Sequence, residues 1–236
     1  MYQKWWSMPK KKQKRIRAVQ RFENVTHDPA PYRGRWRSHV FKNESPITLE
    51  LGCGKGEYTT AFAQTFPDRN FIGLDLKAAR IWVGAKTAQD TGLDNAFFIV
   101  GNALDLPRMF AKGEIEEIWI PFPDPFYKKP RKRLMSPRYL HAYRDILTPD
   151  SFLHFKTDDP RLYHYATASI PRAEGWIHHA ADDLYRSHIE DERVKLATTY
   201  ESRHRALGKP IKYIRFSLPA HDWFRRDMRR DTWVNE

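Results

Sequence analysis

The sequence predicts an α/β fold with a mostly parallel sheet and helices on both faces. Short apolar runs alternate with helical stretches from Ile47 onwards, which is the pattern of parallel strands joined by crossover helices. A glycine-rich turn, ELGCGKGE, follows the first run. Polar residues close the first three runs, at the edge where open α/β sheets bind their ligands.

The individual elements follow from apolar spacing and from breaker residues. We expect strands over 47–52, 70–76, 96–103, 114–122, 151–159, 176–183 and 212–218. We expect helices over 57–66, 77–92, 136–147 and 161–170, and a short helix from Pro107. In the second helix Ile81, Ala85 and Ala88 recur at helical spacing, and Gly92 is a C-cap.

Length and charge suggest one domain with a basic segment at each end. The 236 residues suit one α/β domain, over 46–219, with a flexible arm over 1–45 and a tail over 220–236. The net charge is +12, which favours a polyanionic partner such as nucleic acid or an anionic membrane. The arm shows no sustained period, and Trp5, Trp6 and Trp36 stand near its cations. We therefore expect it to be extended or disordered and to contact RNA.

Several classes of protein are disfavoured. The single cysteine, Cys53, allows no internal disulfide and fits a reducing cytosol, so we expect a cytoplasmic protein. No apolar run approaches the ~18 residues of a membrane span, and the start of the chain lacks the apolar core of a secretory signal. The ten histidines show no metal-ligand spacing with Cys53, so no metal is expected.

The glycine turn indicates a cofactor site. Its three glycines permit positive φ angles and let a ligand approach a helix N-terminus. The third glycine comes one residue early for the dinucleotide pattern G-x-G-x-x-G, and Glu50 would repel a diphosphate. Asp75, 23 residues after Gly52, is placed to accept hydrogen bonds from a ribose diol, and Asn102 closes the third strand. These residues fit S-adenosylmethionine, which joins an adenosine to a cationic methionine without phosphate. A dinucleotide is the alternative.

A second feature, IPFPDPFYKKPRKRL over 120–134, places an acid at the start of a basic loop. Asp124 lies between two prolines, which restrict its backbone and pre-position its carboxylate. We expect the following cations to contact phosphates: Lys128, Lys129, Arg131, Lys132 and Arg133. An ion pair of Asp124 with its own loop is the alternative.

The motifs LELGCGKGE, GLD, FPDPFYKKPRKR, FKTDD and TTYESR occur in one order over 47–218. This region resembles the bacterial tRNA (guanine-N7-)-methyltransferases. The resemblance implies a Rossmann-like S-adenosylmethionine-dependent methyltransferase fold, and methyl transfer to N7 of a guanine in the variable loop of tRNA. It implies cofactor contacts at Glu50, Gly52, Asp75, Asn102 and Asp124, with Asp124 also catalytic. It implies substrate contacts at Lys128, Asp158, Thr198, Thr199, Tyr200 and Glu201.

The sequence departs from the family at two places. Phe126 stands where the family usually has tryptophan, and the basic run after Lys129 is shorter and lacks histidine. From the residues alone, Asp158 either touches substrate or caps a helix. The segment after Leu196 is either a helical linker capped by Thr198 or a lid that hydrogen-bonds the guanine through Glu201.

Other functions remain possible from the sequence. One is another Rossmann-fold RNA-base or small-molecule methyltransferase, and a second is a non-catalytic RNA-binding relative. The sequence does not specify whether the protein is a monomer or a homodimer, which tRNAs it prefers, or whether it needs a partner subunit.

Overall fold

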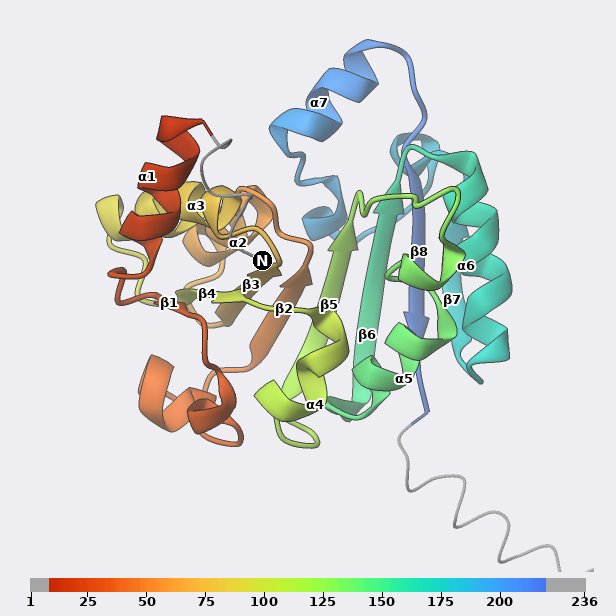
Figure 1. The fold of residues 1–236 in the computed structure, drawn as a ribbon. Helices are drawn as coiled ribbons and strands as arrows, with labels where there is room; N and C mark the ends of the chain where they lie inside the picture. Colours follow the sequence, from red (N-terminus) through yellow and green to blue (C-terminus); the bar gives the residue numbers. More distant parts are fainter. Residues whose placement is uncertain (1–8, 220–236) are drawn as a thin grey trace, which may run out of the picture.

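The sheet is the central feature of the computed structural model, which describes residues 9–219. Its strands are arranged in the order β1-β4-β3-β2-β5-β6-β8-β7 (Figure 1). They are β1 (Val25–Thr26), β2 (Ile47–Leu51), β3 (Asn70–Asp75), β4 (Ala96–Val100), β5 (Ile115–Pro121), β6 (Leu147–Thr157), β7 (Trp176–Ala181) and β8 (Lys212–Ser217). Strands β1 to β6 pair in parallel, whereas β8 lies antiparallel between β6 and β7. The predicted α/β fold with a mostly parallel sheet is confirmed.

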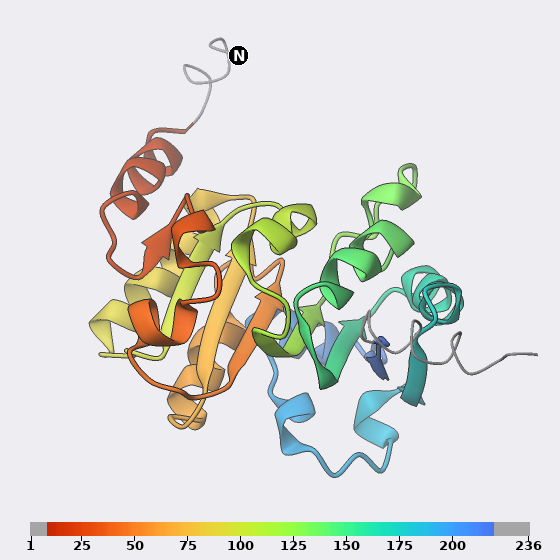
Figure 2. The ribbon, with the colours of Figure 1, turned by 90° about the horizontal axis from the view of Figure 1, so that it is seen from below.

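Helices cover both faces of the sheet (Figure 2). They are α1 (Lys10–Val19), α2 (Glu57–Thr65), α3 (Ala78–Asp90), α4 (Leu106–Met109), α5 (Pro137–Arg144), α6 (Pro160–Arg172) and α7 (Thr199–Ala206). The other helical segments are the 3-10 turns η1 (Ala30–Tyr32), η3 (Ala103–Asp105), η4 (Pro130–Lys132), η5 (Leu184–Arg186) and η6 (Glu192–Lys195), and the π-helix η2 (Trp36–Phe41). Helices α1, α2 and α3 contribute to one apolar core, and α4, α5 and α6 contribute to the other. Because both faces are covered, every residue of β2 and β3 is buried.

The seven strands and five helices that were predicted have bounds within a few residues of the observed ones. The largest difference concerns β6, which begins at Leu147, where 151 was expected. The apolar runs were readable because strands buried on both faces must be apolar nearly throughout.

The N-terminal segment differs from the prediction. Residues 10–19 form helix α1, β1 extends the sheet beside β4, and Val19, Trp36 and Phe41 are buried. The Trp36 indole donates to the carbonyl of Met109 at 2.9 Å, and its backbone N–H donates to Glu114 at 3.2 Å. The expectation of an extended or disordered arm is therefore wrong for residues 10–41, and Trp36 is not available to stack on RNA bases. Tertiary partners of this segment such as Trp82, Ala85 and Met109 lie 60 or more positions away in sequence, so no local periodicity indicates these contacts. Trp5, Trp6 and the tail over 220–236 lie outside the described residues.

A buried charge cluster supports the middle of the sheet. Glu117 of β5 lies 2.8 Å from Nη1 of Arg193 and 3.0 Å from Nε2 of His154, and it accepts from the Thr48 hydroxyl at 3.1 Å. Burial alone raises the pKa of Glu117. The contacts with His154 and Arg193 outweigh this effect and lower the pKa to about 2.

We expect Glu117→Gln to destabilise the protein by about 3 kcal/mol at pH 7, the equivalent of the pKa difference from 4.5 to about 2. A carboxyl with a lowered pKa stabilises the fold above its unfolded pKa, and this contribution is lost as the pH falls towards 2. In urea unfolding, the difference in free energy of unfolding between the wild type and Glu117→Gln should therefore be smaller at pH 3 than at pH 7. Asp90→Asn removes an exposed i,i+4 pair with Lys86 and serves as the control, with a loss below about 0.5 kcal/mol. A gap that is constant with pH would contradict the assignment.

Candidate active site

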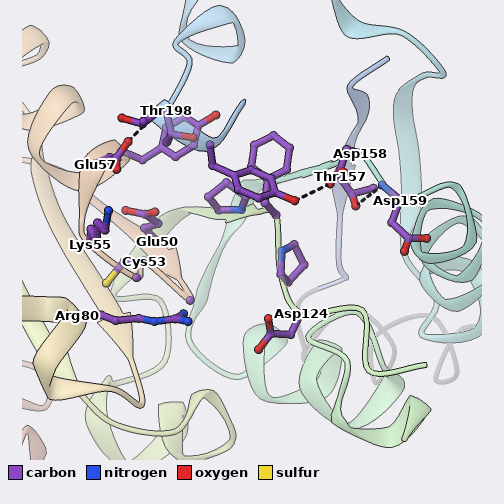
Figure 3. A pocket seen from close by; sticks show the side chains of 18 of the residues that line it. Glu50, Cys53, Lys55, Glu57, Arg80, Asp124, Thr157, Asp158, Asp159 and Thr198 are labelled. Atoms are coloured by element: carbon purple, nitrogen blue, oxygen red, sulfur yellow. Dashed lines mark hydrogen bonds between the residues drawn. The ribbon is translucent and has the colours of Figure 1, made fainter. Parts of the chain in front are cut away.

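A cavity of about 550 Å³ opens at the carboxyl ends of β2, β5 and β6. It is lined by the turn after β2, the start of α2, the loop after β5, the end of β6 and the start of α7 (Figure 3). Its carboxylates are Glu50, Glu57, Asp124, Asp158 and Asp159, and its cations are Lys55, Arg80 and Arg203. Carboxylates therefore outnumber cations in the cavity, although the chain as a whole carries +12.

The glycine turn forms one side of the cavity. Gly52 lines it with a φ angle of 71°, and the backbone N–H groups of Gly52 and Cys53 both donate to the carbonyl of Leu74. Gly56 has a φ of 70°, and a Cβ there would lie 2.6 Å from the ring of Phe98. Glycine is therefore required at position 56 by both backbone conformation and packing.

Glu50 lies at the end of β2 and is almost fully buried. Its Oε2 accepts hydrogen bonds from the backbone N–H and the hydroxyl of Thr59. Burial raises the pKa of Glu50 to about 8, although the bonds from Thr59 lower it. A cation in the cavity would favour the charged form of this carboxyl.

Asp75 and Asn102 close neighbouring strands at the same edge, but neither lines the cavity. The Asp75 carboxylate accepts from the backbone N–H of Gly54 at 3.0 Å and of Lys77 at 2.7 Å. Asn102 accepts from the backbone N–H of Leu104 at 3.1 Å. Both side chains order the turns that follow β3 and β4, and contact with an adenosine stays a prediction for them.

Asp124 projects into the cavity from the loop after β5 (Figure 3). It is exposed, and its carboxylate makes no ion pair or hydrogen bond within residues 9–219. Phe122 and Phe126 bracket it with positive φ angles of 49° and 37°, which strain a non-glycine backbone. Arg133 donates to the carbonyl of Pro125 at 2.8 Å and fixes the loop from its far end. The alternative of an ion pair with its own loop is not what the structure shows.

The basic loop lies outside the cavity lining. Lys128, Lys129, Arg131 and Lys132 are exposed and have no carboxylate partner among the described residues. Arg133 differs, because its guanidinium lies 4.4 Å from the ring centroid of Tyr165 and its Nε is bonded to the loop backbone. Arg133 therefore has a structural role, and the other four cations are free to meet phosphates.

Two adjacent acids follow β6 and differ in role. Asp159 caps α6, accepting from the backbone N–H of Leu162 at 3.0 Å. Both acids line the cavity, but Asp158 faces α7, accepting from the Tyr200 hydroxyl at 3.3 Å and lying 2.9 Å from Nδ1 of His204. Of the two interpretations of Asp158, the cap thus belongs to its neighbour.

The start of α7 forms a further wall of the cavity, beside the first turn of α2. Thr198 caps the helix by accepting from the backbone N–H of Glu201 at 3.2 Å, and Thr199 donates from its backbone N–H to Glu57 at 2.7 Å. Tyr200 packs on Phe122, with ring centroids 5.1 Å apart. These three side chains line the cavity, whereas Glu201 is fully buried behind them. The expectation that Glu201 hydrogen-bonds a guanine does not agree with this position.

Comparison with known proteins shows the family. The family described as "Putative methyltransferase" matches residues 44–214. The tRNA (guanine-N(7)-)-methyltransferase of Porphyromonas gingivalis is 45% identical over 81% of this chain and 79% of its own length. That of Christiangramia forsetii is 42% identical over 89% and 98%. The chain belongs to the tRNA (guanine-N(7)-)-methyltransferase family.

Solved structures agree with the fold of this family. The 16S rRNA methyltransferase KamB has a TM-score of 0.58 at 16% identity, covering 77% of this chain and 92% of its own. TrmN from Thermus thermophilus has a TM-score of 0.54 at 17% identity, covering 78% and 47%. These likenesses show the Rossmann-like methyltransferase fold.

For this member of the tRNA (guanine-N(7)-)-methyltransferase family, the structure gathers some predicted site residues in the cavity and not others. Those that line it are Glu50, Gly52, Asp124, Asp158, Thr198, Thr199 and Tyr200; those that do not are Asp75, Asn102, Lys128 and Glu201. Sequence reasoning missed Lys55, Glu57, Tyr58 and Arg80 in the lining, and Lys156 behind it. Lys156 carried a readable signal, because a cation inside an apolar strand needs a buried partner. Among residues 9–219, no group of three or more His, Cys, Asp or Glu side chains could hold a metal ion. Within the same range, no helix has the length and apolar character needed to cross a membrane.

Proposed function

We propose that this chain transfers the methyl group of S-adenosylmethionine to N7 of a guanine in the variable loop of tRNA. The observation that carries the proposal is the exposed, unpaired carboxylate of Asp124, held by a strained loop inside the cavity and followed by a basic loop outside it. The relatives named above are tRNA (guanine-N(7)-)-methyltransferases, which supports the same acceptor. A cytoplasmic location accompanies tRNA as the substrate.

The cavity suits a cationic cofactor without phosphates. Its carboxylates outnumber its cations, and two of them, Glu50 and Glu57, flank the glycine turn. Such a surface attracts a sulfonium or an ammonium and repels a diphosphate. When bound, S-adenosylmethionine supplies a methyl group on a positively charged sulfur. In this proposal Glu50 and Gly52 hold its methionine part, and Asp75 and Asn102 face its adenosine from the neighbouring strand ends.

Methyl transfer to guanine N7 requires the protein mainly to align the donor with the base and to stabilise the positive charge that develops on the purine. Guanine N7 has a lone pair and no proton, so its attack needs no general base. The purine gains positive charge as the methyl group moves to it. The Asp124 carboxylate would stabilise that charge and accept hydrogen bonds from the guanine N1 and N2 hydrogens. Because Asp124 has no protein partner within the described residues, neither interaction requires an existing bond to break.

Basic side chains on two elements offer a surface for the RNA backbone. In addition to the basic loop, α1 exposes Lys10, Lys11, Lys12 and Lys14, with no carboxylate partner among the described residues. Figure 1 places α1 and α7 on the same upper side of the molecule, towards which β5 and β6 point. A folded RNA spanning this side would bring its phosphates to the cations while one base enters the cavity.

We expect the triple variant Lys128→Ala, Lys129→Ala, Arg131→Ala to weaken tRNA binding by about 10- to 100-fold at low salt. The slope of log K against log salt should fall by about 2 to 3, because each lost phosphate contact removes roughly 0.7 to 0.9. The measurement is tRNA binding by fluorescence anisotropy between 50 and roughly 200 mM salt.

A matched control removes the same charge elsewhere. Lys42, Lys112 and Arg172 lie near the amino ends of β2, β5 and β7, away from the cavity. Replacing these three by alanine should leave the salt slope nearly unchanged. If both triple variants had the same slope of log K against log salt, the basic loop would not be part of the RNA interface.

The reaction itself is tested with labelled cofactor. The full chain is incubated with methyl-labelled S-adenosylmethionine and unmodified tRNA, and the tRNA is digested to nucleosides. Label in 7-methylguanosine supports the proposal. Label in another nucleoside would indicate a different base methyltransferase, and binding without transfer would indicate a non-catalytic relative.

A further inference from the structure

Helix α7 is attached to the domain by a buried cluster around Glu201. The Lys156 ammonium lies 2.6 Å from Oε1 and 2.8 Å from Oε2 of Glu201. The hydroxyl of Tyr58 donates to Oε2 at 2.6 Å, and that of Tyr185 donates to Oε1 at 2.9 Å. These groups come from α7, β6, α2 and η5. Both oxygens of Glu201 are therefore occupied by protein donors.

The charges in this cluster are fully removed from water. Lys156 and Glu201 are each 0% exposed, and Lys156 also donates to the carbonyl of Val194 at 2.9 Å and to the Tyr58 hydroxyl at 2.8 Å. Burial lowers the pKa of Lys156 to about 8, although Glu201 raises it. A buried ion pair is seldom more stabilising than apolar residues of the same size, so its presence is weak evidence for a role in general stability.

The first turn of α2 connects this cluster to Glu50 at the end of β2. Three consecutive residues there each make a different contact: Glu57 accepts from the backbone N–H of Thr199, Tyr58 donates to Glu201, and Thr59 donates to Glu50. One rigid helical turn thus joins the wall formed by α7 to the acid that faces the cofactor.

We propose that Glu201 is a positioning residue that acts with Lys156 and Tyr58 to fix α7 as the wall of the cavity, and that it does not contact the guanine. This inference rests on the proposed function for its consequence in catalysis. The positions of Thr198, Thr199 and Tyr200 relative to Glu50 then depend on the buried ion pair of Lys156 and Glu201, neither of which lines the cavity.

Tyr58→Phe tests the attachment without removing a charge or a ring. Its matched control is Tyr143→Phe, which removes another buried hydroxyl, donating to the carbonyl of Leu134 at 2.9 Å on the other side of the sheet. We expect amide hydrogen exchange in residues 199–206 of the free protein to be at least about tenfold faster in Tyr58→Phe, and unchanged in Tyr143→Phe. Equal protection of α7 in both variants would overturn the inference. Hydrogen exchange is measured without substrate. It therefore tests the attachment of α7 even if the wild type makes no 7-methylguanosine.

A double variant separates positioning from substrate contact. Lys156→Met leaves the Glu201 carboxylate buried without its cation, and we expect the KM for tRNA to rise and kcat to fall, each about tenfold or more. Adding Glu201→Gln removes the unpaired charge, so kcat/KM should recover by about tenfold relative to Lys156→Met alone. If Glu201 were a guanine ligand, its further loss could not restore activity. A double variant as inactive as Lys156→Met, or less active, would therefore overturn the assignment.

Discussion

Replacing Asp124 by alanine is expected to lower kcat for methyl transfer by about a thousandfold and to leave the Kd for tRNA within about twofold. This decrease in kcat is the size expected when one pre-positioned charged group that stabilises a transition state is removed. The affinity for tRNA should be retained for two reasons. Asp124 has no ion pair within residues 9–219, so its removal leaves no cation unpaired. The contacts with RNA phosphates are assigned to other residues. Single-turnover methylation and equilibrium tRNA binding measure the two quantities.

The matched control is Asp94→Ala, an exposed acid between α3 and β4 at the opposite edge of the sheet. It should change neither kcat nor Kd. Asp124→Asn gives a finer test, because an amide retains a hydrogen-bond acceptor but not the charge, and we expect it to remain at least a hundredfold slow. Equal losses of kcat and tRNA affinity in Asp124→Ala would place the residue in the RNA-binding surface. A normal kcat in Asp124→Ala would show that Asp124 takes no part in methyl transfer.

The sequence predicted the structure best in segments whose residues all share the same environment, such as strands that are buried on both faces. The runs that became β2, β3 and β4 are apolar because each is covered on both faces, so their order and approximate bounds could be predicted. The position of Glu50 near the carboxyl end of β2, where the cavity opens, could be predicted for a related reason. A polar residue that ends a buried strand must lie at the edge of the sheet.

The sequence was least informative where a residue's role depends on one distant partner. Trp36 stands among cations in the sequence, but it is buried because Met109 and Glu114 receive its N–H groups. Glu201 belongs to a motif associated with substrate, but Lys156 and Tyr58 occupy its carboxylate. Each partner lies at least 45 positions away, and no periodicity links the two positions. Burial of a polar side chain therefore requires the tertiary structure to be seen.

Glu50 gives the second large expected effect, a dependence of cofactor affinity on pH. With a pKa of about 8 in the free protein, the carboxyl is mostly protonated at pH 6 and substantially ionised at pH 7.5. If only the ionised form attracts a cationic ligand, the apparent affinity scales with the ionised fraction. S-adenosylmethionine should then bind about twentyfold more weakly at pH 6 than at pH 7.5. The direction follows from the raised pKa: affinity is lost as the pH falls below about 8, well above the usual range of a glutamate.

Glu50→Gln supplies the matched test, since it fixes the neutral state with nearly the same shape. The variant should bind the cofactor equally weakly at both pH values, with an affinity close to that of the wild type at pH 6. Calorimetric titration in two buffers of different ionisation enthalpy adds a proton count. The wild type should release close to one proton on binding near pH 6, and the variant should release none. An unchanged wild-type affinity across this range without proton release would mean that the ligand leaves Glu50 protonated. In that case the carboxyl would act as a neutral hydrogen-bonding group at the end of β2, and attraction of the cation would fall to the more exposed acids of the cavity.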